Sequence, residues 1–213
     1  AAPEEISSFE VDVADIELQR VGGAMVSVLP RHARVDFTDL ESISELMVAG
    51  AVSAGAYVGL TMTLDFSTAS VYLEGKTTPA TILDENGAVL TGEVPVQVSF
   101  PGAALPTVFS GRHHMFVLDL DLAQAVAVDS TLNQVTFSPV LHAQVDPAAP
   151  KPVALQGNVN AIDVAAQTMM VEKRDVNDVV IGITTVHVNS NTVCQIDGVI
   201  SMGSAGLSSL SPL

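Results

Sequence analysis

The sequence predicts a mainly β protein: an antiparallel β-sandwich of the prealbumin or immunoglobulin type with one short helix, followed by a small, incomplete β-barrel-like domain. Three observations support this prediction. Hydrophobic residues make up 48% of the 213 residues and aromatic ones only 4%, so Val, Ala, Leu and Ile carry the apolar surface. Several segments alternate apolar and polar residues with a period of two, which is typical of half-buried strands. One segment has helical spacing instead.

The first strand is predicted near the N-terminus, and its apolar residues change phase along it. They move from odd to even positions: Phe9, Val11, Val13, Ile16 and Leu18. A β-bulge near residues 14–15 would keep both sets on one buried face, because an extra residue in one strand shifts the alternation of its side chains by one. Turns are predicted at residues 22–23, where two glycines stand together, and at residues 84–87, which end in Asn-Gly.

Four later segments repeat the alternation of a strand. Their apolar residues are Val58, Leu60, Met62, Leu64 and Phe66; Val94, Val96, Val98 and Phe100; Phe116, Leu118, Leu120 and Leu122; and Val135, Phe137, Leu141, Ala143 and Val145. Pro95 predicts that its strand lies at a sheet edge, because proline cannot donate a hydrogen bond to a neighbouring strand. Pro139 is expected to interrupt the last segment.

A helix is predicted over about residues 39–49. Thr38 and Glu41 have the spacing of a capping box, and Gly50 is well placed to end the helix. Its apolar stripe consists of Leu40, Ile43, Leu46 and Met47. We expect this stripe to cover an open end or face of the sheet. A membrane-surface helix is disfavoured, because the polar side carries acidic residues and no Lys or Arg.

The domain boundaries follow from proline and from the restart of strand patterns. The sandwich domain is predicted over residues 1–146, and a stiff, proline-rich linker over residues 147–152. The second domain, residues 153–213, is expected to hold strands at 153–162, 168–173, 179–188 and 192–196. About 60 residues are marginal for an independent core. We therefore expect the native domain to continue past Leu213.

Charge and cysteine content exclude several function classes. The formal net charge is −16, with 24 acidic against 8 basic residues. Such a surface would repel phosphate backbones and anionic lipids, so nucleic acid is not expected as a partner. No apolar stretch approaches the roughly 20 residues of a membrane-spanning helix. Cys194 is the single cysteine and lies in a strand-like run, which favours an inert thiol. No glycine-rich phosphate loop is present, and no cofactor is predicted.

The order of these features resembles an uncharacterised family of bacterial lipoproteins with a β-sandwich domain of unknown function, over about residues 7–146. The matching pieces are residues 11–18 (VDVADIEL), 35–40 (VDFTDL), 54–67 (AGAYVGLTMTLDFS) and 118–123 (LDLDLA). Residues 157–163 (GNVNAID) and 203–210 are similar to a small β-barrel-like domain that often follows it. The resemblance implies export, with a periplasmic, cell-surface or extracellular location. It implies no activity.

Asp119 and Asp121 form the best acidic pair in the sequence. At positions i and i+2 of a strand, they would share one face about 7 Å apart. Paired carboxylates can hold a cation or serve acid–base chemistry. A solvated outer face of the sheet is the simpler interpretation.

His113 and His114 are the candidate metal ligands. Neighbouring histidines on a strand point to opposite faces, whereas in a loop both could reach one metal ion. His142 and His187 each stand alone in a predicted strand. No Gly-x-Ser-x-Gly elbow or calcium-loop spacing is present.

These observations favour a non-catalytic exported module of the cell envelope or extracellular space that acts by protein binding or self-assembly through its sheet edges. The alternative is a domain that binds a small ligand or a cation through Asp119 and Asp121 or through His113 and His114. A hydrolase would need a histidine, an aspartate and a nucleophile brought together from distant strands.

Overall fold

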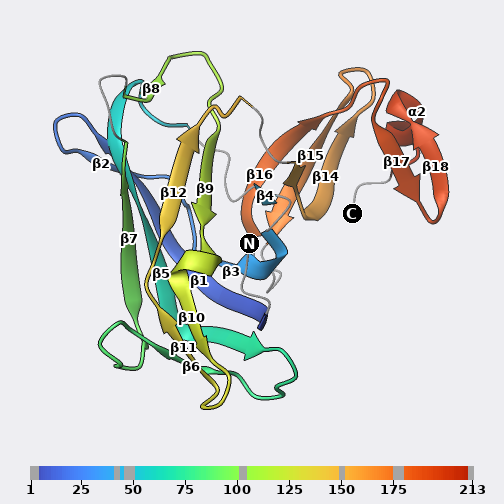
Figure 1. The fold of residues 1–213 in the computed structure, drawn as a ribbon. Helices are drawn as coiled ribbons and strands as arrows, with labels where there is room; N and C mark the ends of the chain where they lie inside the picture. Colours follow the sequence, from blue (N-terminus) through green and yellow to red (C-terminus); the bar gives the residue numbers. More distant parts are fainter. Residues whose placement is uncertain are drawn as a thin grey trace. The chain divides into compact units, whose positions relative to one another are not determined.

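The computed structural model describes residues 5–40, 44–45, 51–100, 105–148, 152–174 and 180–210. Over these residues the fold is mainly β, with several antiparallel sheets and two short α-helices (Figure 1), which confirms the predicted class. The chain divides into two compact units, Ala1–Ala154 and Leu155–Leu213. The division falls after residue 154, close to the predicted linker at residues 147–152, so residues 153–154 belong to the first unit.

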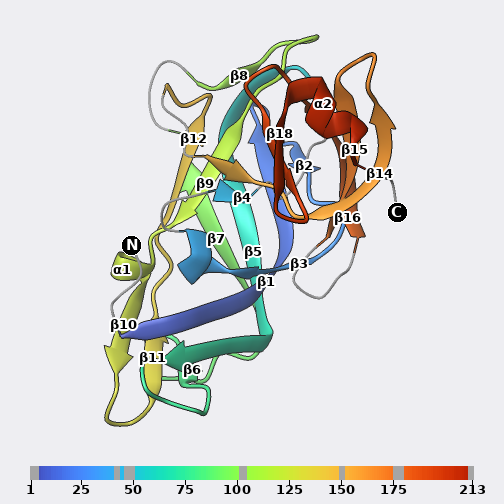
Figure 2. The same cartoon turned by 90° about the vertical axis from the view of Figure 1, so that its right-hand side faces the viewer.

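The first unit is built on a large antiparallel sheet whose two long strands run through most of the unit (Figures 1 and 2). Its strand order is β2 (Met25–Ser27), β1 (Ile6–Arg20), β5 (Gly55–Leu73) and β7 (Glu93–Ser99). Two short strands extend it: β3 (Ala33–Asp36) pairs with β1, and β8 (Thr107–Val108) pairs with β5. Because β7 pairs only with β5 among the described strands, it is an edge strand, as Pro95 predicts.

Smaller sheets complete the first unit. One consists of β10 (Val126–Asp129), β11 (Gln134–Phe137) and β6 (Thr81–Leu83), with β6 parallel to β11. A second pairs β9 (Phe116–Leu120) with β12 (Leu141–Val145), and a third pairs β4 (Ser44–Glu45) in parallel with β13 (Val153–Ala154). The helices are α1 (Leu122–Ala125) and a 3₁₀ turn, η1 (Phe37–Leu40). The interruption at Pro139 is confirmed, since it separates β11 from β12.

The predicted phase change in the first strand is also confirmed. All five apolar residues from Phe9 to Leu18 are buried, and the pairing of β1 with β5 shifts register between Val13 and Asp15. The prediction that Val58 lies on the buried face of its strand is wrong. Another shift, between Gln19 and Arg20, places Tyr57 in the core and leaves Val58 half-buried. The β1–β5 pairing has four such shifts, and sequence periodicity located only the one between Val13 and Asp15.

The helix predicted over residues 39–49 is not found where the structure describes this segment. Residues 37–40 form a single 3₁₀ turn, and residues 44–45 form strand β4. Residues 41–43 and 46–50 lie outside the described part of the chain. The strand predicted to reach Leu122 ends at Leu120, because Asp121 caps α1. Leu122 is nevertheless buried, as its apolar character indicates.

Both predicted turns are confirmed. Gly22 and Gly23 have positive φ angles between β1 and β2. In the second turn the Asp84 carboxylate accepts hydrogen bonds from the backbone of Asn86 and Ala88, and Gly87 has a positive φ.

The second unit contains a three-stranded antiparallel sheet and a separate hairpin. The sheet consists of β14 (Gly157–Asp163), β15 (Thr168–Arg174) and β16 (Val180–His187), and the hairpin of β17 (Val193–Ile196) and β18 (Val199–Met202). Helix α2 (Gly203–Ser208) follows the hairpin. Sequence periodicity located β14 to β17, but the first of these strands was predicted to begin at residue 153, and residues 153–154 form β13 of the first unit instead. It missed β18 and α2, which are too short to show a clear period.

Asp36 ties the start of β1 to the end of β3. Its carboxylate accepts hydrogen bonds from the Ser8 hydroxyl (2.8 Å), the Phe9 N–H (3.0 Å), and both the N–H and the hydroxyl of Thr38 (3.0 and 2.7 Å). Burial raises the pKa of Asp36, but the hydrogen bonds from Thr38, Phe9 and Ser8 outweigh burial and hold the pKa below its usual value.

We expect Asp36→Asn to lower the free energy of unfolding at pH 7 by about 1–2 kcal/mol, because the amide loses charge-assisted hydrogen bonds at a partly exposed site. A lowered folded-state pKa stabilises the fold above the unfolded-state pKa of about 3.9, and this stabilisation is lost as the pH falls through the folded-state pKa. The difference in unfolding free energy between the wild type and Asp36→Asn should therefore shrink below about pH 4. Urea unfolding at several pH values measures it, with Asp39→Asn at an exposed carboxylate as the control. A deficit independent of pH would contradict this assignment.

Candidate functional site

A shallow hollow of the first unit lies beside the loop that carries both candidate histidines. It encloses about 450 Å³ between residues 106–114 and the end of β12. Apolar side chains from Phe100, Pro106, Ala143 and Val145 form part of its wall. The polar groups that line it are Thr107, Arg112, His114 and Asp146. Because the hollow is open to solvent, it is a shallow surface feature and not an enclosed active-site cavity.

His114 is fixed in this wall by both ring nitrogens. Its Nδ1 lies 2.7 Å from the Asp146 carboxylate, and its Nε2 accepts a hydrogen bond from the Phe109 N–H at 3.0 Å. These partners assign the neutral tautomer with the proton on Nδ1. The imidazole is 10% exposed. His113 is an exposed neighbour in the same loop. Since both nitrogens of His114 are engaged, His113 and His114 do not form a shared metal site in this arrangement.

Asp146 anchors the loop to the end of β12. It has a positive φ of 47°, and its carboxylate accepts a hydrogen bond from the Met115 N–H at 2.7 Å. Its own N–H donates to the Met115 carbonyl at 2.8 Å. The Met115 N–H and the His114 side chain together lower the pKa of Asp146. This aspartate therefore stays ionised and binds His114, which lies 32 positions before it in the sequence.

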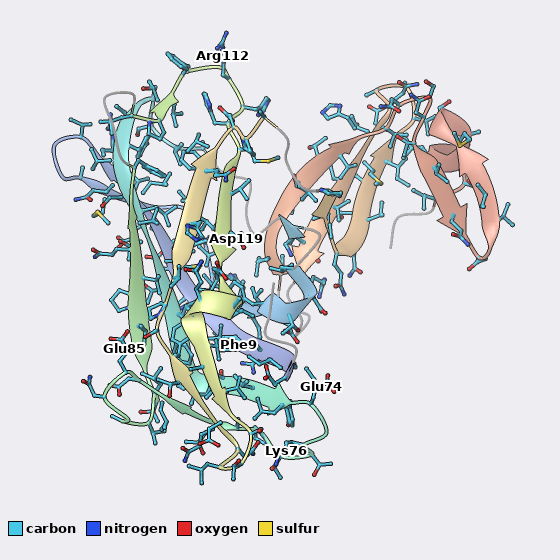
Figure 3. All side chains as sticks on the ribbon, in the orientation of Figure 1. Phe9, Glu74, Lys76, Glu85, Arg112 and Asp119 are labelled. Atoms are coloured by element: carbon cyan, nitrogen blue, oxygen red, sulfur yellow. The ribbon has the colours of Figure 1, made fainter. Side chains whose placement is uncertain are left out.

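The predicted acidic pair is separated by the end of β9. Asp119 lies on β9 with an exposed side chain (Figure 3) and is paired in register with His142 of β12. Asp121 instead caps α1, and its carboxylate accepts hydrogen bonds from the backbone and the side chain of Gln124. The Gln124 side chain is the main cause of a lowered pKa at Asp121. The two aspartates do not share one strand face, contrary to the sequence prediction, because the chain turns into a helix between them.

Phe109 and Arg112 are the residues of this loop that sequence analysis missed. The guanidinium of Arg112 lies 5.7 Å from the centroid of the Phe109 ring, and Phe109 is 53% exposed. Figure 3 shows Arg112 at the tip of its loop, far along the unit from Asp119. The only sequence signal was an isolated aromatic residue close to a Gly-Arg turn. A cation over an aromatic face at an exposed site contributes about 0.5–1 kcal/mol, so this pair can preorganise the loop.

The His114–Asp146 pair has the geometry of two members of a hydrolytic triad. A triad also needs a hydroxyl or thiol on the other imidazole nitrogen, and here a backbone N–H occupies that position. Within the described residues, no group of three or more His, Cys, Asp or Glu side chains is placed to hold a metal ion. Cys194 is half-buried in β17 and belongs to the other unit. In the described part of the chain, the two His114 nitrogens are bonded to Phe109 and Asp146, and these bonds hold the loop in place.

Comparison with protein-family models, with curated proteins and with solved structures found no match to this chain. The resemblance to a bacterial lipoprotein family therefore stays a prediction. None of the helices in the described part of the chain has the length and apolar character needed to span a bilayer.

Proposed function

We propose that this chain is a non-catalytic, exported module of the cell envelope or extracellular space that acts by protein binding or assembly through its sheet edges. Strand β7 carries the proposal, because it lies at the edge of the largest sheet. An edge strand presents unpaired N–H and C=O groups to which another strand can add.

The pairing pattern identifies which groups of β7 face outward. Val94, Val96 and Val98 point their side chains toward the core, and the N–H of Phe100 donates to the Val58 carbonyl of β5. The main chain at these even positions is therefore bonded to β5, and the main chain at Gln97 and Ser99 faces away from it. Pro95 has the same strand phase as Gln97 and Ser99, so its missing N–H removes no hydrogen bond to β5.

The proposal includes a β-sandwich of the prealbumin or immunoglobulin type in the first unit and a small barrel-like second domain. In support of the sandwich, residues of β9, β11 and β12 contribute to the same buried core as β1 and β5. The acidic composition and the family resemblance of the sequence support an exported location.

The test is the native mass of the purified chain by light scattering, with electron microscopy of the same sample. We expect particles larger than 22.1 kDa, or a captured partner from an envelope extract. Gln97→Pro should abolish association through the β7 edge, because it removes an outward N–H without breaking the ladder to β5. Gln97→Ala, which keeps the N–H, is the matched control and should associate normally.

Two results would contradict the proposal. One is a single 22.1 kDa species that captures no partner. The other is equal association of the proline and alanine variants, which would exclude the β7 edge as the contact.

A further inference from the structure

The hairpin of the second unit has a main-chain edge whose free groups can be assigned. Asp197 and Gly198 both have positive φ angles, 50° and 82°, and form a two-residue turn of the type I′ kind. The residues that flank such a turn form a hydrogen-bonded pair, so bonded pairs recur at every second position. The bond from the Gly203 N–H to the Thr192 carbonyl (2.8 Å) agrees with this phase. The N–H groups of Ile200 and Met202 consequently point away from β17.

Helix α2 covers part of one face of the hairpin, and the other face is open. Helix α2 packs on the covered face so closely that a Cβ at Gly206 would lie 2.6 Å from Cys194 Sγ. The opposite face carries Val193, Ile200 and Met202, which are 60%, 66% and 50% exposed. Two of these large apolar side chains, Ile200 and Met202, lie on β18, whose outer edge is unpaired among the described strands. No Lys, Arg or Pro interrupts residues 193–202. Natural proteins use those residues to protect an edge.

The distribution of charge favours a second copy of this chain as the occupant. Residues 155–213 contain only five acidic and two basic residues of the 24 and 8 in the whole chain. The single charge within the hairpin is Asp197, in the turn. Two hairpins can therefore meet without the like-charge repulsion that the first unit would bring.

The strand is also complementary to itself. If two copies of β18 pair antiparallel around a two-fold axis at Ser201, Ile200 of one copy lies opposite Met202 of the other. Met202 N–H then donates to the Ile200 carbonyl of the second copy, and the two-fold axis repeats this bond. The apolar faces of both hairpins join into one continuous face.

We propose that the β18 edge, with the Ile200 and Met202 side chains beside it, binds a second copy of this chain, forming a four-stranded antiparallel sheet. This inference goes beyond the β7 edge of the proposed function, since it assigns a second assembly edge, β18, and names its partner. The contact is smaller than the roughly 1,600 Å² of a standard interface, so we expect a dissociation constant on the order of 10–100 µM.

The experiment is sedimentation velocity of the full chain between about 1 µM and about 1 mM, comparing wild type with two lysine variants. Ile200→Lys places a charge in the apolar cross-strand pair with Met202 of the second copy and should raise the dissociation constant at least tenfold. Val199→Lys is the matched control. The Val199 side chain, next to Ile200 in sequence, is similarly exposed, at 68%, but it points to the opposite face of β18. The dissociation constant of Val199→Lys should therefore change less than twofold. Both changes are at exposed positions, and both variants should fold.

Amide hydrogen exchange at low and high protein concentration tests the edge itself. We expect Met202 to become protected with concentration, while Val193 and Gln195 on the outer edge of β17 do not. A monomer at all concentrations, or equal dimerisation of Ile200→Lys and wild type, would overturn this inference. The β7 proposal would survive either result if a partner were captured in a Gln97-dependent manner, so the two failures are distinguishable.

Discussion

Phe137→Ala should lower the free energy of unfolding of the first unit by about 3–5 kcal/mol. Phe137 lies on β11 and is 2% exposed. Its ring centroid lies 5.8 Å from that of Phe9 on β1 and 5.0 Å from that of Phe66 on β5. Removing the ring therefore leaves a cavity where the small sheet packs on the large one, and it also removes two aromatic contacts of about 0.5–1.5 kcal/mol each.

Tyrosine fluorescence during urea unfolding measures this change selectively. The chain has no tryptophan, and its two tyrosines, Tyr57 and Tyr72, both lie on β5 of the first unit. The signal is therefore independent of the second unit. Phe109→Ala is the control, since that ring is 53% exposed and its loss should change stability by less than about 1 kcal/mol. If Phe137→Ala and Phe109→Ala destabilised the unit equally, the aromatic contact would not hold the sheets together.

Arg34→Met should lower the free energy of unfolding by about 2–4 kcal/mol, less than for a fully buried ion pair because the partner carboxylates retain some exposure. The Arg34 side chain is only 11% exposed. Its guanidinium contacts Glu10 at 3.0 Å and Asp12 at 3.5 Å, and it donates to the Thr68 carbonyl at 2.9 Å. Methionine keeps most of the apolar volume but leaves these groups without their cation.

The position of these contacts explains the large expected effect. Between the pairs Glu10↔Ser70 and Asp12↔Asp65, β1 advances two residues while β5 advances five. The extra residues of β5 include Thr68, whose carbonyl and hydroxyl both accept from Arg34. Arg34 on β3 thus satisfies main-chain and side-chain groups that an irregular ladder leaves unpaired.

Arg34→Lys separates charge from geometry. A single ammonium group cannot bond Glu10 and Thr68 in the directions that a planar guanidinium reaches, so we expect lysine to recover less than half of the loss. Arg31→Met, at an exposed arginine, is the control for loss of a positive charge. Full recovery by lysine would show that charge alone stabilises this part of the sheet.

Several features of the fold could be predicted because they depend on local patterns. The burial of Phe9 through Leu18 and the bulge at residues 13–15 followed from side-chain alternation. The edge position of β7 followed from Pro95, because a missing N–H restricts a strand in any fold. The helix predicted over residues 39–49 is not found at the described residues 39–40 and 44–45, because residues 44–45 pair with β13 as a short strand and local helical spacing gives no sign of such a distant partner.

The candidate site depended on contacts that no local pattern encodes. The sequence singled out His113 and His114 but gave no sign that Asp146, 32 residues away from His114, would bind its Nδ1. It placed Asp119 and Asp121 on one face, whereas capping of α1 redirected the second carboxylate.

By itself, the sequence determined the mainly β class, the buried faces of the long strands, several turns and the strongly acidic surface, because backbone preference and the period of two act over a few residues. Only the tertiary structure decided that Arg34 joins Glu10 to Thr68 and that His114 is held by Asp146. It also decided that α2 covers just one face of the β17–β18 hairpin. These outcomes depend on which distant segments meet, and hydrophobic burial, which is non-directional, leaves that choice to the packing of the whole unit.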